Sequence, residues 1–129
     1  MPDQEAFERG LKLRNSVFGE DGEQRRRELA KFDPDFADYI IECAWGKILA
    51  RPGLDTKRRE LLSLAAVAVL GRLPEVRIHV NGALAVGNSR QEVVETLVQM
   101  SVYAGMPTAL EAIKVASEVF KERGLWPPD

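Results

Sequence analysis

The residues from Leu61 to Leu70 form an apolar run that only Ser63 interrupts. The run is about half the length that a helix needs to cross a bilayer, so it predicts a helix that is buried within protein. A helix that is apolar on every side must be covered on every side, and a chain of 129 residues offers few neighbours to cover it. We therefore expect a homo-oligomer that buries part of this helix between subunits, with the central helix of a monomer as the alternative.

Signals that start and end helices recur along the chain. Ser89-Arg90-Gln91-Glu92 matches a capping box, and Asp33-Pro34 is typical of a helix cap followed by a first-turn proline. Glycines and prolines separate the segments, and none of them shows the period-two alternation of a strand. The predicted helices cover residues 3–18, 23–31, 34–50, 56–70, 74–86, 89–104 and 107–122. The pattern predicts an all-α fold, a helical bundle of about six to seven helices in a single domain, residues 1–129.

The counts of charged and metal-binding residues exclude several classes of protein. With 18 Lys plus Arg and 20 Asp plus Glu, the formal net charge of −2 argues against nucleic acid or an anionic membrane as a partner. The single cysteine, Cys43, and the single histidine, His79, exclude an internal disulfide framework, a CxxC pair and any metal site that needs two imidazoles from one chain. The N-terminus is acidic and polar, unlike a signal peptide, so we expect a soluble protein of the cytoplasm.

The histidine has a carboxylate one helical turn away. Glu75 and His79 are four residues apart on one predicted helix, so the two side chains share a face. A carboxylate beside an imidazole orients the ring and stabilises its protonated form, which is a common way to build a general acid or base. The alternative is a solvated surface pair. Arg72 lies at the N-terminal entrance of the same helix, where unpaired N–H groups and the helix dipole favour an anion.

Two further carboxylates and the cysteine are open to both functional and structural interpretations. Glu42 interrupts an apolar stretch, so it is either a buried carboxylate that needs a partner or part of the solvent stripe of an amphipathic helix. Glu60, near the start of the apolar helix, is interpreted mainly as an acid that favours the helix dipole. Cys43 is interpreted as packing rather than as a nucleophile, and Trp45 and Tyr103 as core or pocket wall.

Short segments along most of the chain resemble the carboxymuconolactone decarboxylase family. They are, in order, Cys43-Ala44-Trp45-Gly46, Arg51-Pro52-Gly53-Leu54, Arg72-Leu73-Pro74-Glu75-Val76-Arg77-Ile78-His79, Asn81-Gly82-Ala83-Leu84 and Tyr103-Ala104-Gly105-Met106-Pro107-Thr108-Ala109. Their order and spacing match the family from about Phe7 to Phe120. The family is similar in fold to alkylhydroperoxidase D, an all-helical protein that assembles as trimers or hexamers. The resemblance therefore implies an all-helical homo-trimer or homo-hexamer.

The resemblance also separates two kinds of chemistry. Alkylhydroperoxidase D carries a glutamate, then a CxxC pair, then a histidine four residues after the second cysteine. On this sequence the histidine falls on His79 and the glutamate on Glu60, whereas Arg72 and Glu75 occupy the cysteine positions. The resemblance thus disfavours a peroxidase or peroxiredoxin-type activity, for which Cys43 would need an external thiol.

The decarboxylase branch of the family implies a particular reaction. Its substrate is a small-molecule carboxylate, 4-carboxymuconolactone, which is converted to 3-oxoadipate enol-lactone and carbon dioxide in protocatechuate catabolism without a metal or organic cofactor. The implied catalytic groups are an imidazole and carboxylates, namely His79, Glu75, Glu42 and Glu60. The implied substrate-binding groups are cations and aromatic rings, namely Arg72, Arg51, Trp45 and Tyr103.

Each implied group has a role in that reaction. His79, held by Glu75, would protonate the ring carbon after loss of carbon dioxide. Arg72 or Arg51 would bind the substrate carboxylate or the developing oxyanion. Glu42 would repel the departing carboxylate or relay protons, and the aromatic rings would wall the pocket.

Overall fold

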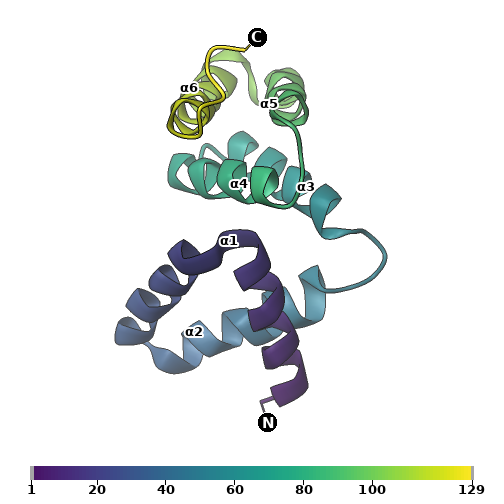
Figure 1. Ribbon diagram of the computed structural model, residues 1–129, viewed down its shortest axis with the longest axis vertical. Coiled ribbons are helices and arrows are strands. Elements are labelled where there is room, and N and C mark those ends of the chain that lie inside the picture. Colours follow the sequence, from purple (N-terminus) through teal and green to yellow (C-terminus); the bar gives the residue numbers. More distant parts are fainter. Residues whose placement is uncertain (1, 129) are drawn as a thin grey trace. The chain divides into compact units, whose positions relative to one another are not determined.

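The computed structural model describes residues 2–128, and its regular elements are helices (Figure 1). In chain order they are α1 (Gln4–Phe32), α2 (Pro34–Ile40), the π-helical segment η1 (Ile41–Leu49), α3 (Thr56–Val69), α4 (Leu73–Ala85), α5 (Arg90–Ala104) and α6 (Met106–Glu122). This architecture confirms the predicted all-α fold. The chain divides into two compact units, of which the first ends at Thr56 and the second begins at Lys57.

The first unit consists of α1, α2 and η1. The break predicted between two helices near residues 19–22 falls at Gly19, whose φ of 57° and ψ of −143° interrupt the helical backbone of α1. Glycine adopts this conformation without the clash that a Cβ atom would bring. Asp33 then ends α1 and caps α2, since its Oδ1 accepts hydrogen bonds from the backbone N–H groups of Asp35 and Phe36.

Helix α1 and segment η1 cross with their backbones in contact. A Cβ atom added to Gly46 would lie 2.0 Å from the carbonyl oxygen of Ala6, and one added to Gly10 would lie 2.2 Å from that of Ile41. Across this crossing, Nε of Arg9 donates a hydrogen bond to the carbonyl oxygen of Gly46 at 2.9 Å. The sequence predicts one regular helix over residues 34–50, whereas the structure changes from α to π geometry at Ile41. The crossing joins segments that are far apart in the sequence, so the local spacing of apolar residues does not predict it.

The second unit buries its core between α3, α4, α5 and α6. The core side chains are Leu64, Ala68, Val76, Val80, Ala83, Val93, Leu97, Ala112, Ala116, Val119 and Phe120. The predicted capping box is present at the start of α5, where Ser89 and Glu92 each accept a hydrogen bond from the backbone N–H of the other.

The apolar helix α3 is only partly covered within the chain. Leu64 and Ala68 are buried, whereas Leu62 is 57% exposed and Leu70 is 68% exposed.

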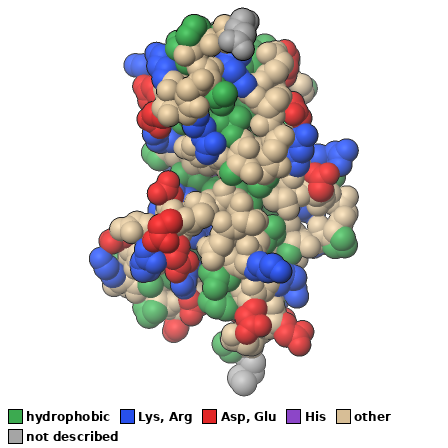
Figure 2. Space-filling model, viewed as in Figure 1, with side chains coloured by type: hydrophobic (Ala, Val, Ile, Leu, Met, Phe, Trp, Pro, Cys, Tyr) green, Lys and Arg blue, Asp and Glu red, His purple; other side chains and the backbone are tan. Residues whose placement is uncertain are grey.

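None of the helices among residues 2–128 has the length and apolar character that a membrane span requires. On the face drawn in Figure 2, acidic and basic side chains are interspersed rather than gathered by sign.

Candidate active site

The single histidine is bonded to a buried carboxylate from a neighbouring helix. Nδ1 of His79 on α4 lies 2.9 Å from Oε2 of Glu60 on α3. The Glu60 side chain is 3% exposed and that of His79 is 15% exposed. A carboxylate so far from water requires a hydrogen-bonded partner, and this pairing favours the imidazole tautomer that carries a proton on Nδ1. The hydrogen bond holds the imidazole ring in a fixed orientation against α3.

The helical period explains why both side chains point inward. Glu60, Leu64 and Ala68 recur every fourth residue and are the buried residues of α3. On α4, His79 follows the buried Val76 by three residues and precedes the buried Ala83 by four, so it shares their side of the helix and borders the core. The interpretation of Glu60 as an acid that serves only the helix dipole is therefore wrong, because its carboxylate is buried and bonded to the imidazole.

The structure assigns the imidazole a different carboxylate from the one that the i,i+4 spacing predicts. Glu75 lies in the first turn of α4 and is exposed, and the carboxylate bonded to His79 is that of Glu60. The two residues do share one side of α4, but Nδ1 is turned toward α3. Arg72, the N-cap residue of α4, is exposed as well. Tyr103, near the end of α5, is 72% exposed.

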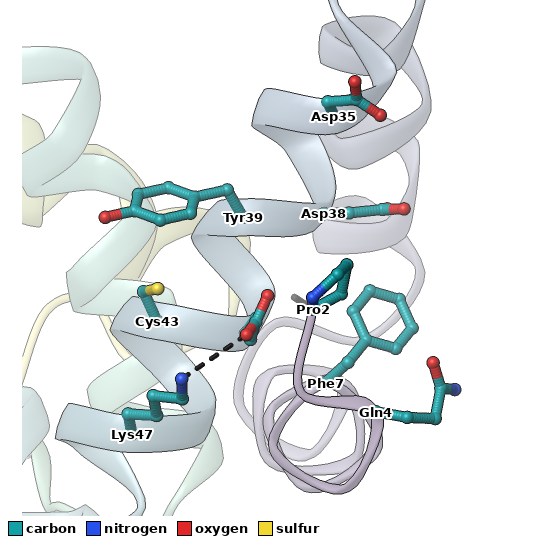
Figure 3. A pocket seen from close by; sticks show the side chains of 9 residues that line it. Pro2, Gln4, Phe7, Asp35, Asp38, Tyr39, Cys43 and Lys47 are labelled. Atoms are coloured by element: carbon teal, nitrogen blue, oxygen red, sulfur yellow. Dashed lines mark ion pairs between the residues drawn. The ribbon is translucent and has the colours of Figure 1, made fainter.

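Glu42 belongs to the first unit and has the partners that a partly buried carboxylate needs. Its side chain is 14% exposed, and its Oε1 lies 3.4 Å from Nζ of Lys47 (Figure 3). The same oxygen accepts a hydrogen bond from the backbone N–H of Asp3 at 2.8 Å. Glu42 and Lys47 line a cavity of about 610 Å³. Lys47 is absent from the predicted site, although its position five residues after Glu42 on one predicted helix is a weak signal of this pair.

Cys43 lines the same cavity and is partly buried (Figure 3). The neighbouring Cys43 thiol raises the pKa of the Tyr39 phenol above its ordinary value. Lys47 follows Cys43 by one helical turn in the wall of this cavity, so a cation does stand near the thiol. The interpretation of Cys43 as pure packing therefore describes its partial burial but misses these polar neighbours.

Arg51 and Trp45 have different environments within the first unit. Arg51 is exposed and lines a cavity of about 530 Å³ together with Arg9 and Lys12. Trp45 is 7% exposed and packs edge-on against Phe18, with ring centroids 5.3 Å apart and an interplanar angle of 78°. Of its two predicted environments, the structure places Trp45 in the core.

The predicted site residues thus divide between the two units. The structure brings Glu60 and His79 into contact, with Glu75 one helical turn from His79 on α4. Glu42, Trp45 and Arg51 belong to the first unit. Across the part of the chain that the structure describes, no three His, Cys, Asp or Glu side chains gather as they would around a metal ion.

An all-helical fold with a buried carboxylate–imidazole pair defines a class of helical proteins equipped for acid–base chemistry. The family model for the carboxymuconolactone decarboxylase family matches residues 34–118 of this chain. The chain belongs to the carboxymuconolactone decarboxylase family, and it is a carboxy-lyase.

Curated relatives are similar to this chain over most of its length. One is named 4-carboxymuconolactone decarboxylase, from Acinetobacter baylyi; it is 37% identical over 128 residues, which cover 98% of this chain and 96% of the relative. Another is named nitrosuccinic acid decarboxylase, from Metarhizium robertsii; it is 32% identical over 117 residues, which cover 90% of this chain and 82% of the relative.

Proposed function

We propose that this protein decarboxylates 4-carboxymuconolactone to 3-oxoadipate enol-lactone, with His79 as the proton donor. The observation that carries the proposal is the hydrogen bond between Glu60 and His79, which provides an oriented acid for a reaction that needs one. The similarity to the Acinetobacter baylyi enzyme over nearly the whole chain supports the choice of substrate.

The chemistry of the reaction requires one proton donor and one stabiliser of negative charge. The bond between the ring carbon and the carboxylate breaks, carbon dioxide leaves, and the electron pair moves through the ring alkene onto the lactone carbonyl oxygen. A cation or N–H donor at that oxygen stabilises the dienolate. Nε2 of the His79 imidazolium then protonates a ring carbon, while Nδ1–H stays bonded to Glu60. The neutral imidazole takes up a proton from water before the next turnover.

The remaining predicted residues have supporting roles in this proposal. Arg72 binds a substrate carboxylate or the lactone oxygen, since it caps the helix that carries His79 and its side chain is exposed. Arg51 is the alternative cation for binding the substrate carboxylate or the lactone oxygen. Glu75, exposed on the same helix, repels the departing carboxylate or exchanges protons with the substrate.

Glu42, Trp45 and Tyr103 complete the proposal. Glu42 relays protons within the cavity that it lines together with Lys47. Trp45 supports η1 from within the core, and Tyr103 contributes an exposed ring to the pocket wall.

The proposal includes a homo-oligomer, a trimer or a hexamer. Exposed apolar side chains on α3, just after it, and around the turn between α5 and α6 support it: Leu62, Leu70, Val102, Tyr103, Met106 and Leu110. Burying these side chains between subunits would remove a large apolar surface from water. Light scattering should give three or six times the chain mass of 14.4 kDa, and a mass of one chain would contradict this part of the proposal.

The proposed reaction is tested by carbon dioxide release from 4-carboxymuconolactone. His79→Ala should lower kcat at least about 100-fold, the lower range for loss of a general acid. Glu60→Gln keeps a hydrogen-bond acceptor for Nδ1 but removes the charge, so it should lower kcat by less than His79→Ala does. Glu111→Gln, at an exposed position on α6, is the matched control. Full activity of His79→Ala would contradict the acid role.

A second candidate substrate follows from the Metarhizium robertsii relative. Nitrosuccinic acid carries a carboxylate on the carbon that bears the nitro group, so its decarboxylation likewise leaves a carbanion that needs stabilisation and a proton. The assay should therefore compare kcat/KM for the two acids under the same conditions. A higher value for nitrosuccinic acid would overturn the choice of 4-carboxymuconolactone. The activity of His79→Ala would then still decide whether His79 is the proton donor.

A further inference from the structure

Asn88, between α4 and α5, is a buried polar residue that joins two helices. It is 4% exposed, and its side-chain amide nitrogen donates one hydrogen bond to the carbonyl oxygen of Lys57 at 3.0 Å and another to that of Ala83 at 3.1 Å. Lys57 lies in the first turn of α3 and Ala83 lies in the last turns of α4. The amide therefore links the start of α3 to the end of α4.

The link lies one turn away from the Glu60–His79 pair on both helices. Lys57 precedes Glu60 by three residues on α3, and Ala83 follows His79 by four residues on α4. Residues three or four apart share a helix face. The Asn88 amide and the Glu60–His79 hydrogen bond are consequently two neighbouring polar connections between α3 and α4, which lie beside each other in Figure 1.

Packing alone does not account for an asparagine at this position. Its Oδ1 atom is buried and has no hydrogen-bond partner among the described residues. Burying an unbonded carbonyl oxygen opposes folding, so an apolar side chain of similar size would serve packing better. The carbonyl oxygen of Ala83 also accepts a hydrogen bond from the backbone N–H of Asn88 at 3.0 Å, so it does not depend on the side chain. What the side-chain amide adds is the connection to α3.

We propose that Asn88 is a positioning residue for the acid of the reaction. By holding the first turn of α3 against the end of α4, it keeps Oε2 of Glu60 within hydrogen-bond distance of Nδ1 of His79. This inference rests on the proposed function, in which that hydrogen bond orients the proton donor. A displacement of α3 by about 1 Å would take the 2.9 Å contact beyond hydrogen-bond length, and a misplacement of that size can lower a catalytic rate about 100-fold.

The test compares variants at Asn88 with a variant of its neighbour. Asn88→Leu removes both donated hydrogen bonds at similar volume, and Asn88→Asp keeps the shape of the side chain but replaces the donor with a carboxylate. Ser89→Ala removes the hydrogen bond that Ser89 Oγ accepts from the backbone N–H of Glu92, so it destabilises the same loop, and it keeps the ion pair between Lys57 of α3 and Glu92. Comparing the three separates the loss of the connection to α3 from a general loss of stability.

Two measurements are made on each variant, produced without a histidine tag. The first is kcat and KM for carbon dioxide release. The second is the imidazole ¹⁵N spectrum, recorded at a pH at which the ring is neutral, in which every signal comes from His79 because the chain has one histidine. We expect Asn88→Leu and Asn88→Asp to lower kcat at least about tenfold with KM little changed, and to replace the Nδ1–H tautomer with a mixture of tautomers. Ser89→Ala should retain the parent kcat and the parent spectrum.

The possible outcomes separate this inference from the proposed function. If both Asn88 variants keep the Nδ1–H tautomer, or if Ser89→Ala changes the spectrum as much as they do, Asn88 is not a positioning residue. If the parent protein releases no carbon dioxide, the proposed function is wrong, and the tautomer spectrum still decides whether Asn88 orients His79. If Asn88→Leu does not fold, Asn88→Asp provides the same readings.

Discussion

Replacing Gly46 with alanine should destabilise the first unit, because its backbone lies against the backbone of α1. The added Cβ atom would lie 2.0 Å from the carbonyl oxygen and 2.7 Å from the carbonyl carbon of Ala6. These atoms belong to the backbone of a helix, so no change of rotamer relieves the overlap. To reach ordinary van der Waals contact, α1 must move away from η1 by more than 1 Å, roughly the shortfall from a normal carbon–oxygen separation.

The expected change in the free energy of unfolding combines three contributions. Overpacking at the upper end of its usual range destabilises by about 3 kcal/mol. The shift also breaks the hydrogen bond from Arg9 to the carbonyl oxygen of Gly46, which contributes about 1 kcal/mol. The lower conformational entropy of alanine in the unfolded chain offsets about 1 kcal/mol. Gly46→Ala should therefore destabilise the protein by about 3 kcal/mol.

Urea unfolding followed by tryptophan fluorescence measures this change, since Trp45 lies next to Gly46 and is buried. Gly53→Ala is the matched control, because a Cβ atom there meets nothing within 4 Å and the φ of Gly53 is not positive. The control should change the free energy of unfolding by less than about 0.5 kcal/mol. Equal urea midpoints for the two variants would refute the close crossing of α1 and η1.

The perturbed pKa values lead to two further predictions. Glu23 has its pKa lowered mainly by the hydrogen bond from Arg26, so its stabilising effect is complete above the ordinary value of 4.5 and is lost as the pH falls through the lower value of the folded state. The difference in unfolding free energy between the parent and Glu23→Gln should therefore shrink below pH 4.5, and a pH-independent difference would exclude the linkage. The pKa of Tyr39 is raised mainly by the neighbouring Cys43 thiol, so Cys43→Ala should lower this pKa. Ultraviolet absorbance of the phenolate measures this, with Tyr103→Phe removing the signal of the second tyrosine, and an unchanged titration would contradict the contact.

Local signals predicted most of the helices because each one depends on a few neighbouring residues. The capping box at Ser89 and the cap at Asp33 place the starts of α5 and α2, and Gly19 breaks α1 where the chain needs a positive φ. The π geometry of η1 was not predictable in this way. It accompanies a crossing with α1 that depends on Gly10, a residue far away in the sequence.

The site was predicted less completely, because its contacts also join residues that are far apart in the sequence. The spacing of Glu75 and His79 describes one helix, whereas the partner of a buried imidazole depends on which helix packs against it. The family resemblance did place Glu60 at the position of the relay glutamate, and that is the carboxylate that the structure bonds to His79. Asn88 had no signal in the sequence, because its amide is significant only through carbonyl groups on two other helices.

The positions of the charged residues on α3 and α4 favour proton transfer over thiol chemistry at this site. Glu60 and His79 form the buried pair, and they fall on the two positions of the peroxidase relay that bear no thiol. At the two cysteine positions the chain has Arg72 and Glu75, both exposed on the first turn of α4 or just before it. A guanidinium there can bind an anionic substrate at a helix N-terminus that already favours anions. In the proposed function, the same helix therefore provides an anion-binding group at its start and an oriented imidazole about two turns later, the combination that we propose for decarboxylation of a small acid.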